Sequence, residues 1–321
     1  MRYKTFGKTG EKVSVIGFGT WVTGGIYWGD VDDSRSIGAI RAAVDLGINV
    51  IDTAPIYGVG HSETVVGQAT KGIRDKVFIA TKFGLGTEEF FETHKGINDN
   101  SRKKVFEDCE NSLKRLQTDY IDLLLVHWPD PGTPLEETCT AMADLQKQGK
   151  VRFLGACNFS EEEITEAEQY CDFSVLQHRY SILSRRGQPV LRFASRRNIG
   201  TMSFGSLDGG FLTGAYRAPT AFDEQDERTI GYRFFREPDF SKGIQIIGAM
   251  DKIAQARGRS TAEVALNWNT QSPLISTALV GMRSAAEVDL NVKAMEWELT
   301  PDEMDQIDGA CSRVLGYEPN K

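Results

Sequence analysis

Four side chains that can transfer or accept a proton stand at the ends of short apolar runs in the first half of the chain. Asp52 and Tyr57 follow NVIDTAPIYG, Lys82 ends KVFIATK, and His127 ends YIDLLLVH. A phenol stays protonated until about pH 10, but a nearby ammonium stabilises phenolate and lowers that pKa. We therefore expect Lys82 to lower the pKa of Tyr57, Asp52 to hold Lys82 charged, and His127 to hydrogen bond to a substrate oxygen. Such a set suits proton transfer at a carbonyl or hydroxyl oxygen.

A repeating fold has to bring these residues together. The sequence contains eight apolar runs that are typical of strands, and they alternate with helical patterns. The runs are 13–19, 49–53, 76–82, 120–127, 153–157, 174–178, 200–204 and 275–281, and helices are expected over 34–47, 101–116 and 135–150. Strands that are apolar on both faces, each followed by a helix, indicate an α/β fold with a buried parallel sheet; eight such units predict a (β/α)8 TIM barrel. Active sites of that fold lie at the carboxyl ends of the strands, where all four side chains should meet.

Two segments fall outside the repeat. The opening RYKTFGKTGEKVS is expected to form a β-hairpin that closes the barrel bottom. Residues 205–274 are too many for one crossover, and loops of that length usually carry function or disorder; within them, the acidic run DEQDE (223–227) should be solvated. No Pro/Ser-rich linker or shift in composition divides the chain, so we expect a single domain over residues 1–321, with long loops at the mouth.

Composition excludes several functional classes. The net charge of −8 and the absence of a basic run longer than three residues argue against a nucleic-acid partner. The chain has no stretch of 18 apolar residues, which argues against a membrane partner, and we expect a cytoplasmic protein. The five cysteines contain no CxxC pair and are expected to be reduced. No feature of the sequence predicts the oligomeric state.

A proton donor beside a carbonyl still needs a source of electrons. The four histidines (61, 94, 127 and 178) are scattered and no HExxH or Cys/His cluster occurs, so no metal site is expected. An organic hydride carrier is the alternative. The GFG at 17–19 is not continued as a GxGxxG fingerprint, because position 22 is valine. A barrel can instead bind phosphates after its last two strands, here at the glycine-rich 203–216 and at 281–291, which carries Arg283 at a helix start.

At these positions the sequence resembles the aldo-keto reductase family over essentially its whole length. The motifs are DTAPIYG (52–58), ATKFG (80–84), LLLVHWPD (123–130), GACNFS (155–160), LQHRYS (176–181), SFGSLDGGFLTG (203–214) and GMRSAAEVDLN (281–291). The resemblance implies a barrel that binds NADP(H) or NAD(H) and reversibly reduces aldehydes or ketones. It also implies that Tyr57 is the general acid/base, that Lys82 and Asp52 tune it, and that His127 positions the carbonyl.

The resemblance further implies the cofactor site. Asn158 and Gln177 would hold the nicotinamide carboxamide, Phe204 would stack on the ring, the 205–214 loop would wrap the pyrophosphate, and 281–291 would bind the adenosine end. The implied cofactor residues are Gly19, Thr20, Trp21, Asp52, Cys157, Asn158, Gln177, Phe204, Gly205, Ser206, Leu207, Gly209, Leu212, Gly281, Met282, Arg283, Glu287 and Asn291.

This chain departs from the family pattern at three of these positions. Cys157 replaces the usual serine and is a weaker hydrogen-bond donor, and Phe204 stands where many members have Tyr or Trp. Glu287 replaces Arg or Gln and would repel a 2′-phosphate, whereas Arg283 would bind one. We expect NADP(H), with NAD(H) as the alternative.

The substrate is expected to be a small carbonyl or alcohol. Segments 26–34 and 229–240 resemble bacterial members that act on sugars, polyols or assorted aldehydes. The candidate pocket wall consists of aromatic residues from the loops: Trp21, Tyr27, Trp28, Trp128, Tyr232 and Phe234. Two other functions remain open: a Schiff-base lyase or aldolase with Lys82 as nucleophile, and a cofactor-binding regulatory subunit. The lyase leaves the glycine-rich loop and Arg283 without a task.

Overall fold

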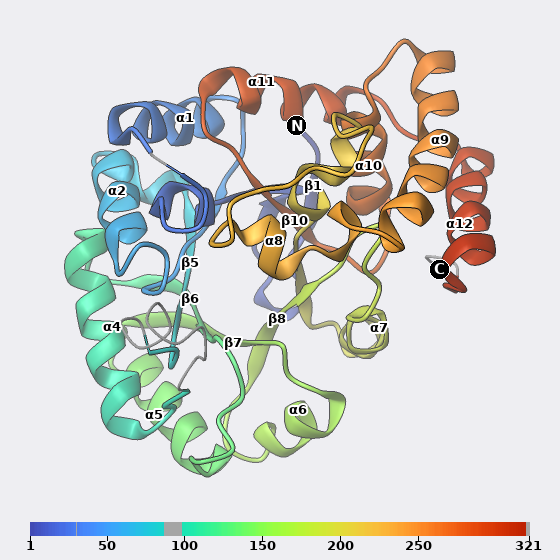
Figure 1. Ribbon diagram of the computed structural model, residues 1–321. Helices are drawn as coiled ribbons and strands as arrows, with labels where there is room; N and C mark the ends of the chain where they lie inside the picture. The colour runs from blue at the N-terminus through green and yellow to red at the C-terminus, as the bar shows by residue number, and fades with distance from the viewer. Residues whose placement is uncertain (30, 87–97, 319–321) are drawn as a thin grey trace.

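Eight parallel strands close into a barrel in the computed structural model, which describes residues 1–29, 31–86 and 98–318 (Figure 1). Along the chain the strands follow one another around the barrel, and the last pairs with the first. They are β3 (Ile16–Gly19), β4 (Val50–Asp52), β5 (Phe78–Phe83), β6 (Ile121–Val126), β7 (Val151–Cys157), β8 (Phe173–Arg179), β9 (Gly200–Phe204) and β10 (Thr277–Gly281). The predicted TIM barrel is confirmed.

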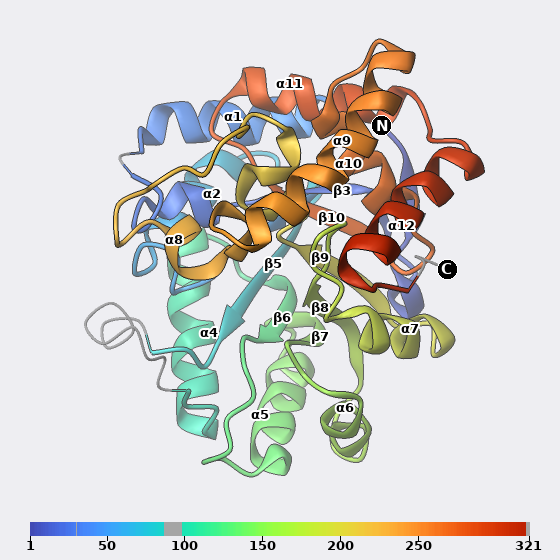
Figure 2. The same ribbon diagram turned by 45° about the vertical axis from the view of Figure 1, so that its right-hand side comes forward.

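Helices surround the strands (Figure 2). They are α1 (Asp33–Asp45), α2 (His61–Thr70), α4 (Arg102–Leu116), α5 (Leu135–Lys147), α6 (Glu161–Ala167), α7 (Gln188–Arg196), α8 (Glu227–Gly231), α9 (Asp239–Arg257), α10 (Thr261–Gln271), α11 (Ala285–Lys293) and α12 (Pro301–Leu315). Short 3-10 turns are η1 (Gly7–Thr9), η2 (Trp21–Gly24), η3 (Arg74–Lys76), η4 (Asp208–Thr213), η5 (Arg233–Phe235) and η6 (Ala294–Glu296). Several starts are fixed by local chemistry: Ser160, Ser260 and Thr300 each form a capping box with a glutamate three residues later. No helix in the described part of the chain is long and apolar enough to span a membrane.

The N-terminal hairpin lies at the amino ends of the strands. β1 (Tyr3–Thr5) pairs antiparallel with β2 (Lys12–Ser14), and the Lys8 amide donates to the Asn198 carbonyl just before β9. The sequence predicted one strand over 13–19, and this was wrong: Ser14 still pairs with β1, and β3 begins at Ile16. An apolar run does not reveal where a strand changes its pairing partner, because the run is buried both where it pairs in the hairpin and where it pairs in the barrel.

The barrel interior is filled with side chains, so chemistry is confined to the ends of the strands. Its core contains Val50, Ala80, Leu123, Leu125, Val175 and Met202, all fully buried. A larger apolar cluster fills the space between strands and helices. The long segment after β9 holds η4, α8, η5, α9 and α10, which pack on one side with α12 in a separate aromatic-rich cluster. The segment after β9 therefore contributes side chains to the hydrophobic core and loop residues to the mouth of the barrel.

Candidate active site

The structure brings Asp52, Tyr57, Lys82 and His127 together at the carboxyl end of the barrel. Lys82 Nζ lies 2.8 and 2.9 Å from the two Asp52 carboxylate oxygens, 2.9 Å from the Thr53 carbonyl oxygen and 3.2 Å from Tyr57 Oη. The Tyr57 and His127 rings meet edge-on, with centroids 6.2 Å apart. The first three side chains are buried, whereas His127 is partly exposed. The cluster therefore presents an imidazole and a phenol edge to the mouth above a buried ion pair.

Burial controls the protonation states of these groups. It raises the pKa of Tyr57 above its ordinary value and outweighs the opposing effect of the Lys82 ammonium. Lys82 lowers this pKa, as the sequence led us to expect, but the loss of water around the phenol is the larger effect and the net shift is upward. Burial and the Lys82 charge also hold the pKa of His127 well below its ordinary value. At neutral pH the mouth holds a neutral phenol and a neutral imidazole.

Lys82 stays charged despite its burial. Burial alone lowers the pKa of an ammonium, but opposing negative charge, chiefly that of the Asp52 carboxylate, raises the pKa of Lys82 above its ordinary value. An amine must be neutral to attack a carbonyl. With its ammonium engaged by three different residues, Lys82 is poorly suited to act as a Schiff-base nucleophile.

Backbone contacts fix the positions of Asp52 and Tyr57. The Thr20 amide and hydroxyl both donate to the Asp52 carbonyl oxygen, at 3.0 and 2.8 Å, and the Ser62 hydroxyl donates to Thr20 Oγ1 at 2.6 Å. Gly58, directly after Tyr57, has φ +67°, and a Cβ there would lie 2.3 Å from the Gly24 carbonyl oxygen. The turn that carries Tyr57 is thus pressed against η2, at a position that only glycine fits.

Aromatic rings line one side of Tyr57. The Trp21 ring stacks on Tyr57 with centroids 5.8 Å apart and planes 14° apart, and Trp28 meets Trp21 edge-on at 5.9 Å. Trp128, next to His127, is 45% exposed. Phe234 does not belong to this wall, because it is buried in the aromatic cluster beneath α9.

Amide side chains occur at the ends of β7 and β8. Asn158, with φ +62°, donates from Nδ2 to the His127 carbonyl oxygen at 3.1 Å. Gln177 donates from Nε2 to Asp52 Oδ2 at 2.8 Å, and the Cys157 thiol points at Gln177 Oε1 at 3.6 Å. Each amide offers a donor and an acceptor, which is the complement of a carboxamide. This donor set fits a nicotinamide.

The glycine-rich loop after β9 is tightly coiled. Positive φ angles occur at Gly205, Asp208, Gly209, Gly210 and Gly214. A Cβ on Gly209 would lie 2.9 Å from Cγ of Tyr232, so this backbone rests directly on that ring. Of the other residues expected here, Ser206 and Leu212 are buried, whereas Leu207, like Phe204 at the end of β9, is partly exposed. Such a loop leaves backbone in close approach to the mouth, as phosphate binding requires.

Arg179 joins this loop to α8. Its guanidinium lies 4.3 Å from the centroid of the Tyr232 ring, 3.5 Å from Asp208 Oδ1, and donates to the Gly231 carbonyl oxygen at 2.9 Å. Burial raises the pKa of Asp208 to about 6 against the lowering effect of Arg179, and burial raises that of Glu227 to about 7. The acidic run DEQDE was expected to be a solvated loop; its first three residues are exposed, whereas Asp226 and Glu227 are partly buried.

The segment after β10 begins with Gly281 and a buried Met282 and ends at a partly buried Asn291. Arg283 is exposed and donates to the Trp28 carbonyl oxygen at 3.1 Å. Its backbone amide donates to Glu287 Oε2 at 2.8 Å, so this carboxylate closes the first turn of α11. Arg283 and Glu287 were expected to compete at the adenosine end. The Glu287 carboxylate is engaged at the start of its own helix, whereas the Arg283 guanidinium contacts Trp28.

A comparison with protein families decides the identity. The profile of the aldo/keto reductase family matches residues 15–311. The chain belongs to the aldo/keto reductase family. It is an NAD(P)H-dependent oxidoreductase that reduces carbonyl groups.

Individual relatives cover nearly the whole chain. Aldo-keto reductase YhdN of Bacillus subtilis (strain 168) is 38% identical over 319 residues, 98% of this chain and 95% of that protein. The NADH-specific methylglyoxal reductase of Escherichia coli (strain K12) is 31% identical, over 94% of this chain and 95% of that protein. The solved glycerol dehydrogenase AKR11B4 from Gluconobacter oxydans has a TM-score of 0.87 at 32% identity, over 99% and 96% of the two chains. An aldo/keto reductase from Klebsiella pneumoniae in complex with NADP and acetate has a TM-score of 0.73 at 28% identity, over 96% and 94%.

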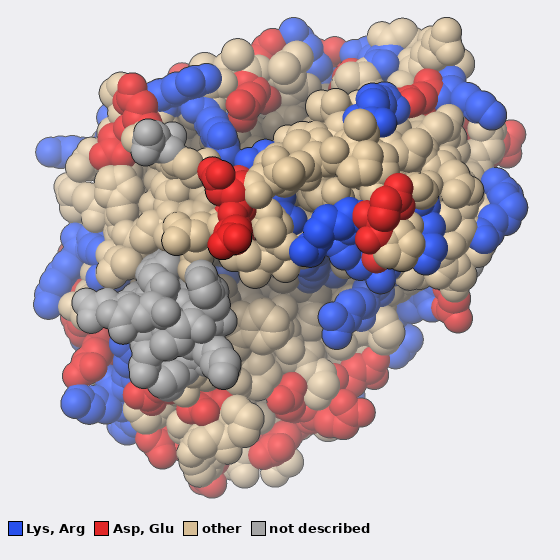
Figure 3. Space-filling model, in the orientation of Figure 1, with Lys and Arg blue, Asp and Glu red and all other residues tan. Residues whose placement is uncertain are grey.

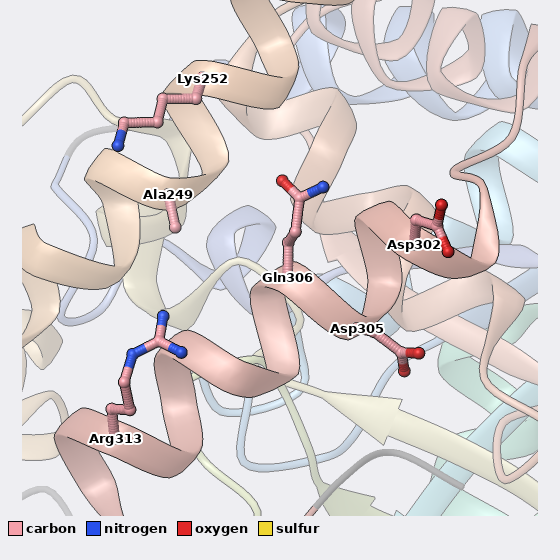
Figure 4. A pocket seen from close by; sticks show the side chains of 6 residues that line it. All are labelled: Ala249, Lys252, Asp302, Asp305, Gln306 and Arg313. Carbon is pink, nitrogen blue, oxygen red and sulfur yellow. The ribbon is translucent and has the colours of Figure 1, made fainter.

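Other features of this reductase lie apart from the four candidate catalytic residues, Asp52, Tyr57, Lys82 and His127. A surface hollow of about 600 Å³ between α9 and α12 is lined by Ala249, Lys252, Asp302, Asp305, Gln306 and Arg313 (Figure 4). It includes none of the expected site residues. Charges of both signs are mixed on the face seen in Figure 3. Within residues 1–29, 31–86 and 98–318, no group of three His, Cys, Asp or Glu could hold a metal ion; His94 lies outside these ranges.

Sequence reasoning missed four residues that shape the site: Arg179, Asp208, Ser62 and Thr53. Arg179 could have been found, because it follows Gln177 by two positions and so points to the same face of its strand. Asp208 is the only acid in SFGSLDGGFLTGAY, which is also a visible signal. The Ser62 hydroxyl, in the first turn of α2, lies 3.0 Å from Oγ1 of Thr53, which follows β4; this contact leaves no pattern in the sequence.

Proposed function

We propose that this aldo/keto reductase interconverts a small polyol- or sugar-derived carbonyl compound and its alcohol in the cytoplasm, with NADP(H) preferred. The observation that carries the proposal is the buried Asp52–Lys82 pair, with Lys82 Nζ 3.2 Å from the hydroxyl of a neutral Tyr57. A neutral phenol beside a fixed ammonium can give up a proton and leave a stabilised phenolate.

In reduction, Tyr57 Oη donates its proton to the carbonyl oxygen. A nicotinamide cofactor, once held by Asn158 and Gln177, would supply a hydride from C4 to the carbonyl carbon. The Lys82 ammonium stabilises the remaining phenolate, and the neutral His127 ring donates a hydrogen bond to the same substrate oxygen. In oxidation the Tyr57 phenolate takes the alcohol proton, so Tyr57 is acid in one direction and base in the other.

Residues from five strand ends would hold the cofactor. Asn158 and Gln177 supply amides for the nicotinamide carboxamide, with Cys157 beside them, and Phe204 offers a ring face. The 205–214 loop supplies backbone for the pyrophosphate, through Gly205, Ser206, Leu207, Gly209 and Leu212. Gly19, Thr20 and Trp21 flank the nicotinamide end, and Gly281, Met282, Arg283, Glu287 and Asn291 flank the adenosine end.

The preference for NADP(H) rests on Arg283 and Glu287. An Arg guanidinium binds phosphate strongly, and Arg283 is exposed, with its guanidinium donating to the Trp28 carbonyl oxygen and lying 5.9 Å from the centroid of the Trp28 ring. Glu287 accepts from the Arg283 backbone amide and is thereby oriented toward its own helix start. Relatives support both cofactors: one is described as NADH-specific and one is in complex with NADP.

Titration with NADPH and NADH, followed by quenching of the five tryptophans, tests this proposal without knowledge of the substrate. We expect NADPH to bind about tenfold or more tightly, in line with one charge-assisted contact. Arg283→Gln should remove most of this difference, whereas Glu287→Gln should not. Tighter binding of NADH would assign the decision to Glu287, and binding of neither cofactor would contradict the reductase site.

The polyol and sugar class is supported by the fold-level match to a glycerol dehydrogenase. The test measures the reduction of glyceraldehyde, a sugar-derived carbonyl compound, and of methylglyoxal, the substrate named for the Escherichia coli relative, each with NADPH. A kcat/KM for glyceraldehyde that is well above that for methylglyoxal is the expected result.

A further inference from the structure

Gln177 reaches across the barrel to the catalytic ion pair. It belongs to β8, which lies opposite β4 in the closed barrel, with three strands between them on either side. Its side chain is 3% exposed, and Nε2 lies 2.8 Å from Oδ2 of Asp52, a residue 125 positions away in the chain. Asp52 Oδ2 therefore accepts from Gln177 and from Lys82 at the same time.

The surroundings fix which way the Gln177 amide points. Nε2 faces the Asp52 carboxylate and the Met202 sulfur at 3.8 Å, both of which are acceptors. Oε1 faces the Cys157 thiol at 3.6 Å, which is a donor. The reversed amide would place its carbonyl oxygen against a carboxylate. Gln177 is thus a donor to Asp52 and an acceptor toward Cys157.

We propose that Gln177 is a positioning residue for Asp52, and that through Asp52 and Lys82 it sets how readily Tyr57 exchanges its proton. The proposal goes beyond a role of Gln177 in holding the nicotinamide, and it rests on the proposed function of Tyr57. Its physical basis is a continuous chain of buried contacts from Cys157 through Gln177, Asp52 and Lys82 to Tyr57, with separations of 3.6, 2.8, 2.8 and 3.2 Å.

Charge explains the direction of the effect. The Asp52 carboxylate raises the pKa of Tyr57, whereas Lys82 lowers it. A hydrogen bond donated by Gln177 offsets part of the Asp52 charge, so its removal should make the phenolate harder to form. The charged and titratable groups around Tyr57 come from five segments: Asp52, Lys82, His127, Cys157 and Tyr232. Among these, Asp52 is the one that Gln177 contacts through its donor group.

The test uses alcohol oxidation, in which Tyr57 must be deprotonated to act as the base. Gln177→Met keeps the length of the side chain and removes the donor. At saturating NADP⁺, kcat for the oxidation of glycerol and of benzyl alcohol should rise with pH as Tyr57 loses its proton; we call this rise the limb of the pH profile. In the variant the limb should lie about 0.5–1 pH unit higher than in the wild type. Below the limb, kcat should fall about three- to tenfold, because each unit of pKa is a factor of ten in phenolate.

Asn158→Ala is the matched control. Its amide donates to the His127 carbonyl oxygen and not to Asp52, so this variant should raise the KM for NADP⁺ and leave the limb in place. If Gln177→Met likewise changes only the cofactor KM, Gln177 holds the cofactor alone and the proposal is overturned.

Gln177→Glu gives a second pH signature. Two carboxyl groups at hydrogen-bond distance share one proton, so the introduced carboxyl group can donate to Asp52 only while that proton is bound. We expect kcat of Gln177→Glu to approach that of the wild type as the pH falls and to drop below that of Gln177→Met as the pH rises. Identical pH profiles for the two variants would contradict the proposal.

A stability measurement keeps the proposal separate from the reductase function. In the cofactor-free protein, Gln177→Met and Asp52→Asn should be coupled: the unfolding constant of the double variant should differ by about fivefold or more from the product of the single effects. Additive effects would overturn the positioning role whether or not any alcohol is oxidised. Intact coupling without cofactor binding or turnover would support the contact and contradict the proposed function.

Discussion

At the scale of single residues, the site is an ion pair from which water is nearly excluded. Lys82 is 0% and Asp52 3% exposed, and the Lys82 ammonium also faces a carbonyl oxygen and the Tyr57 hydroxyl. Buried ion pairs of this kind often add little net stability, yet removal of one partner leaves the other charge buried without a counter-charge. The retention of such a pair beside Tyr57 is therefore explained better by proton transfer than by folding.

Lys82→Met should separate these two effects. It leaves the buried Asp52 carboxylate without its cation, so the free energy of unfolding should fall by about 3–5 kcal/mol. The double variant Asp52→Asn/Lys82→Met should regain most of this loss and yet keep a kcat about 10²- to 10⁴-fold below wild type. Urea unfolding and steady-state kinetics measure the two quantities. A single variant as stable as wild type would mean that the pair is not buried as described.

At the scale of elements, turns after the strands set the positions of the catalytic side chains. The sequence predicted where the strands end, because the length and periodicity of each apolar run mark its end. The structure places the catalytic motifs at these strand ends. It could not predict that burial would raise the pKa of Tyr57, since the amount of water around a phenol depends on the packing of distant loops such as that of Trp21. Arg179 and Asp208 each had a visible signal in the sequence, but the contact between them joins separate segments and leaves none.

Gly58→Ala tests the turn that carries Tyr57. The substitution combines a positive φ of +67° with a Cβ 2.3 Å from the Gly24 carbonyl oxygen, so we expect a loss of more than about 2 kcal/mol in stability and a large fall in kcat. Gly72→Ala is the matched control, because Gly72 has φ +82° but nothing within 4 Å of its Cβ position. It should cost about 1 kcal/mol and leave kcat unchanged. Equal effects of the two substitutions would exclude the clash as the cause.

The Asp208 loop makes stability depend on pH. The pKa of Asp208 is about 6 in the folded chain and about 4 when unfolded, so the folded chain binds more protons between these values. Its contribution to stability is present below pH about 4 and is lost as the pH rises through about 6. Between pH 5 and 8, wild type should lose about 1 kcal/mol more than Asp208→Asn.

Chemical unfolding at these two pH values checks this prediction, with the exposed Asp119→Asn as control. The control should follow the wild type. If Asp208→Asn does so as well, the Asp208 carboxyl is not held in a buried, proton-binding environment.

At the scale of the whole molecule, one barrel gathers residues from all parts of the chain at one end. Trp21 and Gly281 lie 260 residues apart in the chain, with 205–214 between them, yet these three segments lie at the carboxyl ends of β3, β10 and β9, which are adjacent in the sheet. The alternation of strands and helices made this architecture predictable from sequence. The exact division of the first strand was not predictable, because the hairpin and barrel share one apolar run.

Because a cofactor would touch several of these segments, its binding should stabilise the whole fold. With each cofactor at one fixed concentration, 100 times the wild-type Kd for NADPH, NADPH should add about 2.7 kcal/mol to the free energy of unfolding of the wild type and raise Tm by several degrees. Arg283→Gln should reduce the shift with NADPH but not with NADH. A shift that is the same for both cofactors in wild type and variant would show that Arg283 takes no part in the choice.

Every step proposed for this enzyme depends on proton transfer by Tyr57, and Tyr57→Phe removes the group that transfers the proton. The substitution removes one oxygen and keeps the ring that stacks on Trp21. We expect NADPH binding, measured by tryptophan quenching, to stay within about twofold of wild type, whereas kcat for glyceraldehyde reduction should fall by at least about 10². A variant that binds NADPH normally and keeps most of its kcat would show that another group transfers the proton.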